Sequence, residues 1–276
     1  MLEDVVTPAG PYRLRLMCRS GAWGGQLADG TTASAWQRPD GRVVVRTATS
    51  EGLERARFML ALADDTTAFH RRFDRDPLLG PAARALAGYR PLRLATVAHA
   101  ALRAMCGQLI EARRAMQIER SILRQLGSAV ATREGLATLA PAELRRHGLA
   151  ISRASTLSRL LRSLDLERLR EHDTDVVLRR LCRERGVGPW SVGVIAMEGL
   201  GRYDHGLVGD LGLVKLLGSL RGRHVEAAET AELLAPYEEW QGLAGHLLML
   251  GWSRGLIPGA DPDLGRQTRL RTGRAA

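Results

Sequence analysis

Residues 178–217 decide the fold, and they read LRRLCRERGVGPWSVGVIAMEGLGRYDHGLVGDLGLVKLL. The charged segment ahead of Gly186 has helical character, and Gly186-Val187-Gly188 has the composition of a tight turn, since glycine permits positive φ. Pro189 follows at the place of a first helical residue, where the N–H that proline lacks would be unpaired anyway. The stretch predicts two helices joined by a glycine turn, with N–H groups at the second N-terminus that attract a phosphate.

Two other interpretations compete with phosphate binding at this turn. Gly-Val-Gly resembles part of a dinucleotide fingerprint, but the third glycine is misplaced, and the preceding segment is a charged helix rather than an apolar strand. A strand ahead of Gly186 would be needed to support a nucleotide-binding oxidoreductase. Taken alone, the turn also fits a purely structural helix hairpin.

The chain is strongly basic. Its 276 residues include 40 Lys+Arg and 30 Asp+Glu, which gives a formal net charge of +10. Every basic residue except Lys215 is an arginine. Arginine bias can also reflect genomic base composition, but the positive charge favours a polyanionic partner. A mechanism that needs a lysine nucleophile has a single candidate.

Several classes of protein are excluded by composition. Residues 1–10 lack the basic segment and apolar run of a signal peptide, and no stretch approaches the ~18 apolar residues of a membrane span. Cys18, Cys106 and Cys182 are few and far apart, which argues against a disulfide framework and a four-cysteine zinc or iron–sulfur site. A reducing, cytoplasmic compartment is expected.

Residues 1–91 have mixed patterns and predict an α/β N-terminal domain. Apolar residues alternate with arginines over Tyr12–Leu16, and residues 42–48 read RVVVRTA, so each range predicts a strand. Ser50 starts a segment with apolar residues at helical spacing, which predicts a helix capped by Ser50. Prolines and glycines interrupt residues 74–91, which we interpret as a connection to a second domain.

Residues 92–258 predict a helical domain. Apolar residues at helical spacing extend over 100–126, and shorter helices with glycine stops follow. The expected stops are Gly127, Gly148, Gly186, Gly201 and Gly218. Residues 259–276 carry four arginines among small polar residues, which predicts a disordered basic tail.

A distant acidic residue completes the pattern of the helical domain. Asp210 stands 22 residues after Gly188, within the segment VGDLGL of residues 208–213, and Tyr203-Asp204 precedes it. Combined with the GVGPW of residues 186–190, this order resembles the helix–hairpin–helix DNA glycosylases, above all their bacterial 3-methyladenine glycosylase II branch.

Further segments extend this resemblance over residues 90–256. They are Gly107-Gln108-Leu109-Ile110, Gly148-Leu149 with Arg153-Ala154, and Trp240-Gln241-Gly242-Leu243-Ala244. The resemblance implies a mostly α fold, with a helix–hairpin–helix glycosylase core and a smaller α+β N-terminal domain. The first 90 residues resemble the small β-rich domain of that branch only loosely.

By this resemblance Asp210 is the catalytic carboxylate. A carboxylate beside the sugar would stabilise the positive charge that develops as a base leaves, and it would orient or deprotonate water. Asp210 also precedes an apolar helical segment, so it could simply cap that helix. The two roles are compatible.

The resemblance places Trp190 at the substrate pocket, where a flipped base stacks, although a tryptophan after a helix start is also often a core residue. Family members that nick the strand carry at this position a lysine that forms a Schiff base. Lys215 lies elsewhere, inside the following helix. We therefore expect a monofunctional glycosylase with water as the nucleophile, and Lys215 at phosphate or solvent.

Leu109 matches the family's wedge, the apolar side chain that fills the gap left by an extruded nucleotide, and Gln108 is its polar neighbour. Without this context Leu109 would be assigned to the core. Val194, and Met249 or its neighbours, stand where relatives have aromatic rings, and Gln241 stands where they often have arginine. These departures put the base preference in doubt.

The implied partner is double-stranded DNA containing damaged bases, bound by a monomeric, nucleoid-associated protein with no membrane contact. The glycine turn Gly186-Val187-Gly188 would bind phosphate, and five arginines are further candidates, although charged helix faces are usually just solvated. They are Arg113, Arg114, Arg153, Arg159 and Arg185. His205 is a weak candidate for tuning Asp210.

No cofactor and no side-chain metal site are expected, and the resemblance implies at most a monovalent cation on the hairpin carbonyls. The implied activity is base excision repair of alkylated purines such as 3-methyladenine. Two alternatives stay open: a non-catalytic helix–hairpin–helix DNA-binding protein, and a glycosylase of the same fold for oxidised or deaminated bases.

Overall fold

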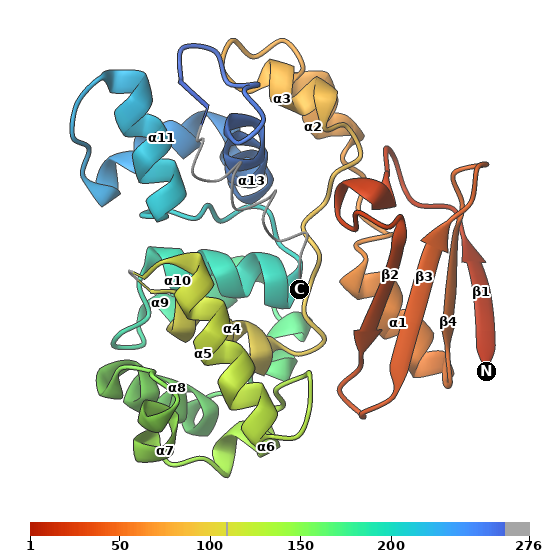
Figure 1. The fold of residues 1–276 in the computed structure, drawn as a ribbon, viewed down its shortest axis with the longest axis vertical. Helices are drawn as coiled ribbons and strands as arrows, with labels where there is room; N and C mark the ends of the chain where they lie inside the picture. Colours follow the sequence, from red (N-terminus) through yellow and green to blue (C-terminus); the bar gives the residue numbers. More distant parts are fainter. Residues whose placement is uncertain (109, 263–276) are drawn as a thin grey trace.

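The computed structural model describes residues 1–108 and 110–262 and is mostly helical. A small sheet with one covering helix lies beside two groups of helices, which Figure 1 shows one above the other. The predicted fold class, a helical core with a smaller α+β N-terminal part, is confirmed.

The N-terminal sheet is antiparallel and has the strand order β1-β4-β3-β2. One of its faces is apolar, with Ala33, Ala35, Val43 and Val45 buried in a core that α1 helps to form. The elements are β1 (Leu2–Val6), β2 (Ala22–Gln26), β3 (Thr32–Gln37), β4 (Val43–Thr47) and α1 (Ser50–Met59).

The strand predicted from RVVVRTA is confirmed as β4, and the helix predicted from Ser50 is confirmed as α1. The N-cap, however, is Thr49 rather than Ser50. The Thr49 hydroxyl accepts a hydrogen bond from the Gly52 N–H at 3.0 Å, which satisfies one of the unpaired groups of the first turn.

The strand predicted over Tyr12–Leu16 is wrong, because Leu14–Leu16 form a short 3-10 helix. Leu14 is fully buried, and its N–H donates to the side-chain oxygen of Gln37 at 2.9 Å. A side chain from β3 therefore satisfies the backbone here, so no neighbouring strand is required.

The segment interpreted as a connection, residues 74–91, contains helical structure. α2 (Thr67–Phe73) and α3 (Gly80–Ala85) pack into the core of the helical domain, where Phe69 and Phe73 are buried. Since α3 packs against α13 (Gln241–Trp252), residues before the expected boundary at residue 91 contribute to the helical core. Pro81 stands in the first turn of α3, where proline is tolerated, so it is compatible with this helix.

The helix predicted over 100–126 is two helices, because the first ends at Gly107 and the second begins at Ala112. The stop predicted at Gly218 is also wrong: Gly218 lies inside α11, which ends before Gly222 at φ +61°. The further helices are α4 (Val97–Gly107), α5 (Ala112–Gln125), α6 (Arg133–Ala137), α7 (Pro141–Arg146), α8 (Ile151–Ser163), α9 (Thr174–Cys182), α10 (Pro189–Val194), α11 (Leu211–Arg221) and α12 (Thr230–Leu234).

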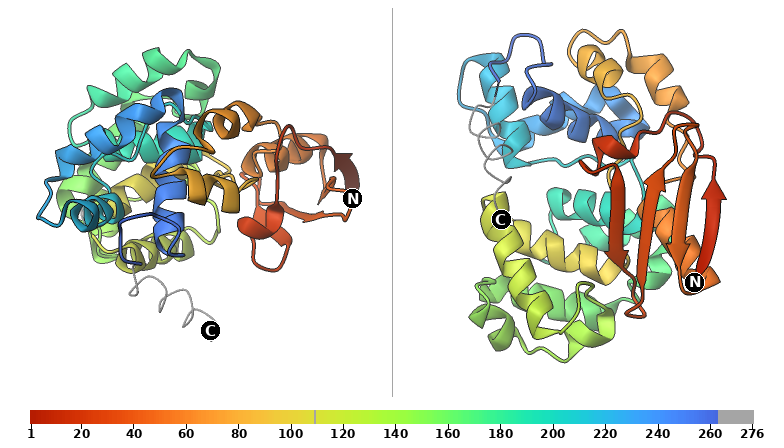
Figure 2. Two further views of the ribbon diagram at one scale, coloured as in Figure 1. Left: turned by 90° about the horizontal axis from the view of Figure 1, so that it is seen from above. Right: turned by 45° about the vertical axis from the view of Figure 1, so that its right-hand side comes forward.

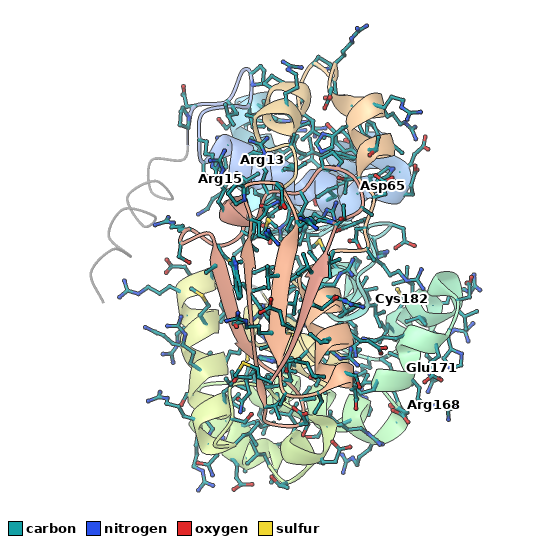
Figure 3. All side chains as sticks on the ribbon, turned by 90° about the vertical axis from the view of Figure 1, so that its right-hand side faces the viewer. Arg13, Arg15, Asp65, Arg168, Glu171 and Cys182 are labelled. Atoms are coloured by element: carbon teal, nitrogen blue, oxygen red, sulfur yellow. The ribbon has the colours of Figure 1, made fainter. Side chains whose placement is uncertain are left out.

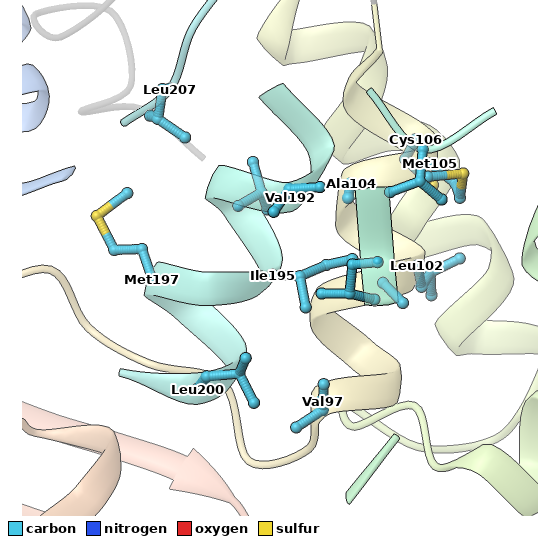
Figure 4. Close-up of a cluster of buried hydrophobic side chains, with 14 of the residues drawn as sticks. Val97, Leu102, Ala104, Met105, Cys106, Val192, Ile195, Met197, Leu200 and Leu207 are labelled. Atoms are coloured by element: carbon cyan, nitrogen blue, oxygen red, sulfur yellow. The ribbon is translucent and has the colours of Figure 1, made fainter. Parts of the chain in front are cut away.

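Helix α10 continues as a π-helical turn, Ile195–Leu200, and this continuous helix packs along α4. Figure 4 shows Val192 and Ile195 facing the apolar side of α4, where Leu102 and Ala104 are fully buried. Burial of each large apolar side chain, such as that of Ile195 or Leu102, stabilises the fold by roughly 1.5–3 kcal/mol. This packing fixes the helix that follows the glycine turn.

A buried ionic cluster joins the same elements. The Glu119 carboxylate of α5 accepts hydrogen bonds from His99 Nε2 at 3.0 Å and from Arg103 Nη2 at 2.8 Å, both from α4. Arg103 Nη1 also donates to Glu198 of the π-helical turn at 2.6 Å. The cluster therefore ties α5 and the π-helical turn to α4.

Two buried arginines hold the sheet unit to the helices. Arg90 donates to the carbonyls of Ala61, at 2.5 Å, and Pro11, at 2.8 Å. Arg93 donates to the Asp64 carboxylate and to the Gly201 carbonyl, at 3.1 Å for the latter, and so reaches the loop after the π-helical turn. Figure 2 shows the sheet beside the helical groups in two further views.

The surface and the chain end add two observations. Figure 3 shows Cys182, Arg168 and Glu171 at the surface, the last two as an exposed ion pair at 3.5 Å. Of the predicted tail, residues 263–276 lie outside the described residues, whereas the Asp261 carbonyl accepts the Trp252 indole N–H at 2.5 Å. In the described ranges no helix is long and apolar enough to cross a membrane.

Candidate active site

The predicted helix–turn–helix is present in the structure. α9 ends at Cys182, and a turn leads to Gly186, whose φ of +86° is the left-handed conformation that favours glycine. Gly188 is extended and caps α10, and Pro189 is the first helical residue, as predicted. Val187 is buried, whereas Gly186, Gly188 and Pro189 are exposed, so the backbone of the turn faces solvent.

Helix α8 supports the turn from one side. A Cβ at Gly186 would lie 2.5 Å from the Thr156 hydroxyl, so only glycine fits against this residue. Arg159 donates to the Arg185 carbonyl, and its Nε lies 3.9 Å from the Glu184 carboxylate. Arg159, one of the expected phosphate contacts, is thus directed to the turn itself.

The end of α4 supports the turn from the other side. The amide nitrogen of Gln108 donates to the Gly186 carbonyl at 3.0 Å and to the Ser191 hydroxyl at 2.8 Å. Leu109, the expected wedge, lies outside the described residues.

Trp190 lies half-buried at the start of α10, in contact with the end of α4. A Cβ at Gly107 would lie only 2.5 Å from Cη2 of the Trp190 ring, so the absence of a side chain at Gly107 makes room for the indole. The indole Nε1–H donates to Oδ2 of Asp210 at 3.0 Å. The structure therefore brings together the two residues that the sequence predicts for pocket and catalysis.

Asp210 is the N-cap of α11, which is the structural role that the sequence also predicts for it. Its Oδ1 accepts hydrogen bonds from the N–H groups of Gly212, at 2.7 Å, and Leu213, at 3.4 Å. Together with the Trp190 indole, three N–H donors therefore hold the two oxygens of this carboxylate in place. The carboxylate also lies at the positive end of the α11 dipole.

The other predicted residues near this carboxylate have diverse positions. Lys215 is exposed on α11, while Val194 and Met249 are buried in the apolar core. A Cβ at Gly206 would lie 3.1 Å from Oε1 of Gln241, which places the Gln241 side chain beside the loop before Asp210. Burial lowers the pKa of His205, which precedes this loop, because a charged imidazole is less well hydrated there.

Some supporting residues were missed by sequence reasoning. Ser191 contacts Gln108, and Thr156 contacts the backbone just before Gly186; both are buried polar residues. The signal that could have found them is a hydroxyl on an otherwise apolar helix face.

Tyr203 and Trp240 form a stacked pair with ring centroids 5.9 Å apart, and the Tyr203 hydroxyl donates to Asp64 at 2.6 Å. The pair anchors the loop that leads to Asp210.

No family model matches the chain. Among proteins of known activity, it is 25% identical over 200 residues to the DNA-3-methyladenine glycosylase of Bacillus subtilis (strain 168). This alignment covers 66% of the chain and 66% of the length of that relative.

Solved structures resemble a larger part of the chain. The 3-methyladenine DNA-glycosylase from Archaeoglobus fulgidus matches with a TM-score of 0.76 at 18% identity, over 92% of this chain and 99% of that one. The Clostridium acetobutylicum 8-oxoguanine glycosylase/lyase, in complex with DNA containing cytosine opposite 8-oxoG, matches with a TM-score of 0.70 at 16% identity, over 92% and 98%. Both share the fold of this chain.

Proposed function

We propose that the chain is a member of the helix–hairpin–helix DNA glycosylase superfamily and acts as a monofunctional DNA glycosylase of base excision repair, which its sequence similarity and its fold support. Its substrates are alkylated purines such as 3-methyladenine, flipped out of duplex DNA and released by hydrolysis. The observation that carries the proposal is the Asp210 carboxylate, held by Gly212 and Leu213 on one oxygen and by Trp190 on the other.

Asp210 acts on the sugar as the N-glycosidic bond breaks. Positive charge develops at C1′ while the base departs, and a fixed anion stabilises that charge without reorganising at the moment of reaction. The three N–H donors limit the movement of the carboxylate, so its charge is already in place before the bond breaks. Asp210 then orients the water that attacks C1′ and accepts its proton.

Water is the nucleophile because Trp190, at the start of α10, stands at the position where lyases that resemble this chain have a lysine. Lys215 is the sole lysine of the chain, and it lies exposed on α11. An amine at that place cannot replace the hairpin lysine, so no Schiff base forms and the DNA strand is not nicked.

The preference for alkylated purines follows from the charge of the leaving group. A 3-methylated purine is cationic, so it departs without protonation by a general acid, and one carboxylate is enough. The face of the Trp190 indole attracts a cationic ring as well as stacking on it. The sequence similarity to the Bacillus subtilis 3-methyladenine glycosylase supports the same substrate class.

The exposed glycine turn binds the DNA backbone in this proposal. Gly186 and Gly188 leave backbone N–H groups accessible to a phosphate oxygen at the N-terminus of α10. The net charge of +10 adds attraction that does not depend on sequence.

The test is base release from duplexes that each carry one lesion, followed by alkali to cleave abasic sites. We expect release of 3-methyladenine, with strand cleavage only after alkali, and a loss of about 100-fold or more in Asp210→Asn with DNA binding retained. Equal base release by wild type and Asp210→Asn would refute the role of Asp210. Cleavage of the DNA strand without alkali would refute the proposal that the enzyme is monofunctional.

Release of an oxidised base is the second candidate, since 8-oxoguanine glycosylases share this fold over most of the chain. The same panel separates the two, because it includes 8-oxoguanine opposite cytosine. A wild-type protein that binds every duplex and releases no base would instead be a DNA-binding module without catalysis.

A further inference from the structure

A single side chain contacts both the glycine turn and the helix that follows it. Gln108 is the C-cap residue of α4, and its amide nitrogen lies 3.0 Å from the Gly186 carbonyl oxygen and 2.8 Å from the Ser191 hydroxyl oxygen. Gly186 lies before the start of α10, while Ser191 belongs to its first turn and directly follows Trp190. The Gln108 amide therefore spans the junction between the turn and α10.

We propose that Gln108 is a positioning residue that sets the glycine turn and Trp190 in their working geometry before DNA binds. The inference deepens the proposed glycosylase function and rests on it. The resemblance implied only that Gln108 is the polar neighbour of the wedge, whereas its amide group donates to two groups of the protein itself, the Gly186 carbonyl and the Ser191 hydroxyl.

The chemistry of these contacts requires an amide at residue 108. A glutamine NH₂ group has two N–H donors, which match two acceptors in different directions. Ser191 is 1% exposed, so water cannot replace the lost partner of its hydroxyl without entering the core. Met105 Sδ lies 3.8 Å from the same nitrogen, so the amide is enclosed by protein on that side.

The position of Trp190 links this contact to catalysis. Gly107, next to Gln108, contacts the Trp190 ring, and Trp190 in turn donates to Asp210. A shift of the first turn of α10 would therefore move the indole relative to both α4 and the carboxylate. Gln108 acts on the reaction through Trp190 and touches none of the reacting atoms.

Two variants isolate the donor function. Gln108→Met keeps the length of the side chain but removes both donors, and Gln108→Glu places carboxylate oxygens against the Gly186 carbonyl. Gln125→Met, at the exposed end of α5, is the matched control. Thermal unfolding of each variant confirms that it is folded.

The first measurement is hydrogen–deuterium exchange of the free protein, read on peptides that cover residues 183–194. We expect Gln108→Met and Gln108→Glu to exchange at least about five times faster there than wild type, because net hydrogen bonds contribute about 1 kcal/mol each. Exchange elsewhere, and the whole of Gln125→Met, should match wild type. Unchanged exchange at 183–194 in both variants would overturn the proposal.

The second measurement is the rate of single-turnover base release over a range of enzyme concentrations up to saturation. A positioning residue predicts a maximal rate about tenfold lower in both variants, with little change in the enzyme concentration that gives half the maximal rate. A residue that only contacts DNA would raise that concentration and leave the maximal rate unchanged, which would refute the inference. If wild type releases no base at all, the proposed function fails, while the exchange measurement still decides the role of Gln108.

Discussion

The indole nitrogen of Trp190 lies 3.0 Å from Oδ2 of Asp210, across the 20 residues that separate them in the chain. One residue is at the start of α10 and the other caps α11, so this hydrogen bond joins the glycine turn to the helix that carries the carboxylate. It also leaves Trp190 two functions in the proposed enzyme, stacking with the base and orienting the acid.

Trp190→Phe separates these functions, because phenylalanine keeps an aromatic face but lacks the N–H donor. We expect the maximal rate of base release to fall about tenfold, as one charge-assisted hydrogen bond contributes on the order of 1.5–3 kcal/mol. Binding to an abasic-site duplex should change little. Trp36→Phe, in the N-terminal sheet, is the control, and an unaltered rate in Trp190→Phe would show that the donor is dispensable.

Gly107→Ala should displace the Trp190 ring, since a Cβ at this position would lie 2.5 Å from Cη2 of the indole. Overpacking of this kind costs roughly 1–3 kcal/mol of stability, and we expect base release to fall with it. Gly135→Ala in α6 is a suitable control, because its Cβ would meet no atom closer than 3.3 Å. Urea unfolding and single-turnover rates measure the two effects, and a Gly107→Ala protein with wild-type values for both would contradict the close contact.

Arg159 and Arg113 should differ in the way they affect DNA binding. Arg159 is directed to the Arg185 carbonyl, whereas Arg113 is exposed in the first turn of α5. Each phosphate contact contributes about 0.9 to the slope of log K against log salt concentration. We expect Arg159→Ala to weaken binding with an unchanged slope and Arg113→Ala to reduce the slope by about 0.9. Binding titrations between low and high salt decide this, and a lower slope in Arg159→Ala would assign Arg159 to phosphate after all.

The buried cluster of α4 and α5 predicts a specific loss of stability in acid. Burial alone would raise the pKa of Glu119, but hydrogen bonds from His99 and Arg103 outweigh it and lower that pKa to about 2. A carboxyl whose pKa is lower in the folded than in the unfolded protein stabilises the fold above its ordinary value of about 4.5. This stabilisation is lost as the pH falls from there towards 2.

Urea unfolding across this pH range measures the effect. The contribution of Glu119 is on the order of 3 kcal/mol, and Glu119→Gln should remove the corresponding part of the pH dependence. Glu171→Gln, in an exposed ion pair, should leave the pH dependence intact. If the wild type and Glu119→Gln lose stability in parallel below pH 4.5, the cluster does not couple Glu119 to folding.

The parts of the fold that could be predicted are those with local signals. Gly186, at positive φ, and Pro189, at the first helical position, each act through their own backbone preference, so the helix–turn–helix was predictable from sequence. The cap at Asp210 was predictable for the same reason. The run of valines in RVVVRTA likewise suffices for β4, because β-branched residues favour strands, and all three valines are buried there.

The parts that could not be predicted depend on contacts between distant segments. The Trp190–Asp210 hydrogen bond requires the loop before α11 to return to α10, and no local pattern encodes that distance. The break after Gly107 was hidden because helical spacing continues on both sides of it. Leu14 looked like a strand residue because apolar residues alternate with arginines around it. In the structure a side chain of β3, rather than a second strand, accepts its N–H.

Arg90 and Arg93 have a consequence for how the molecule unfolds. Arg90 is fully buried and holds the carbonyls of Ala61 and Pro11, while Arg93 joins Asp64 to the Gly201 carbonyl. Separation of the two cores would take the Gly201 carbonyl away from Arg93, and with it one of the partners that balance the loss of hydration of this guanidinium. The protein should therefore melt as one cooperative unit, with a calorimetric enthalpy equal to the van't Hoff enthalpy, even though it contains two hydrophobic cores.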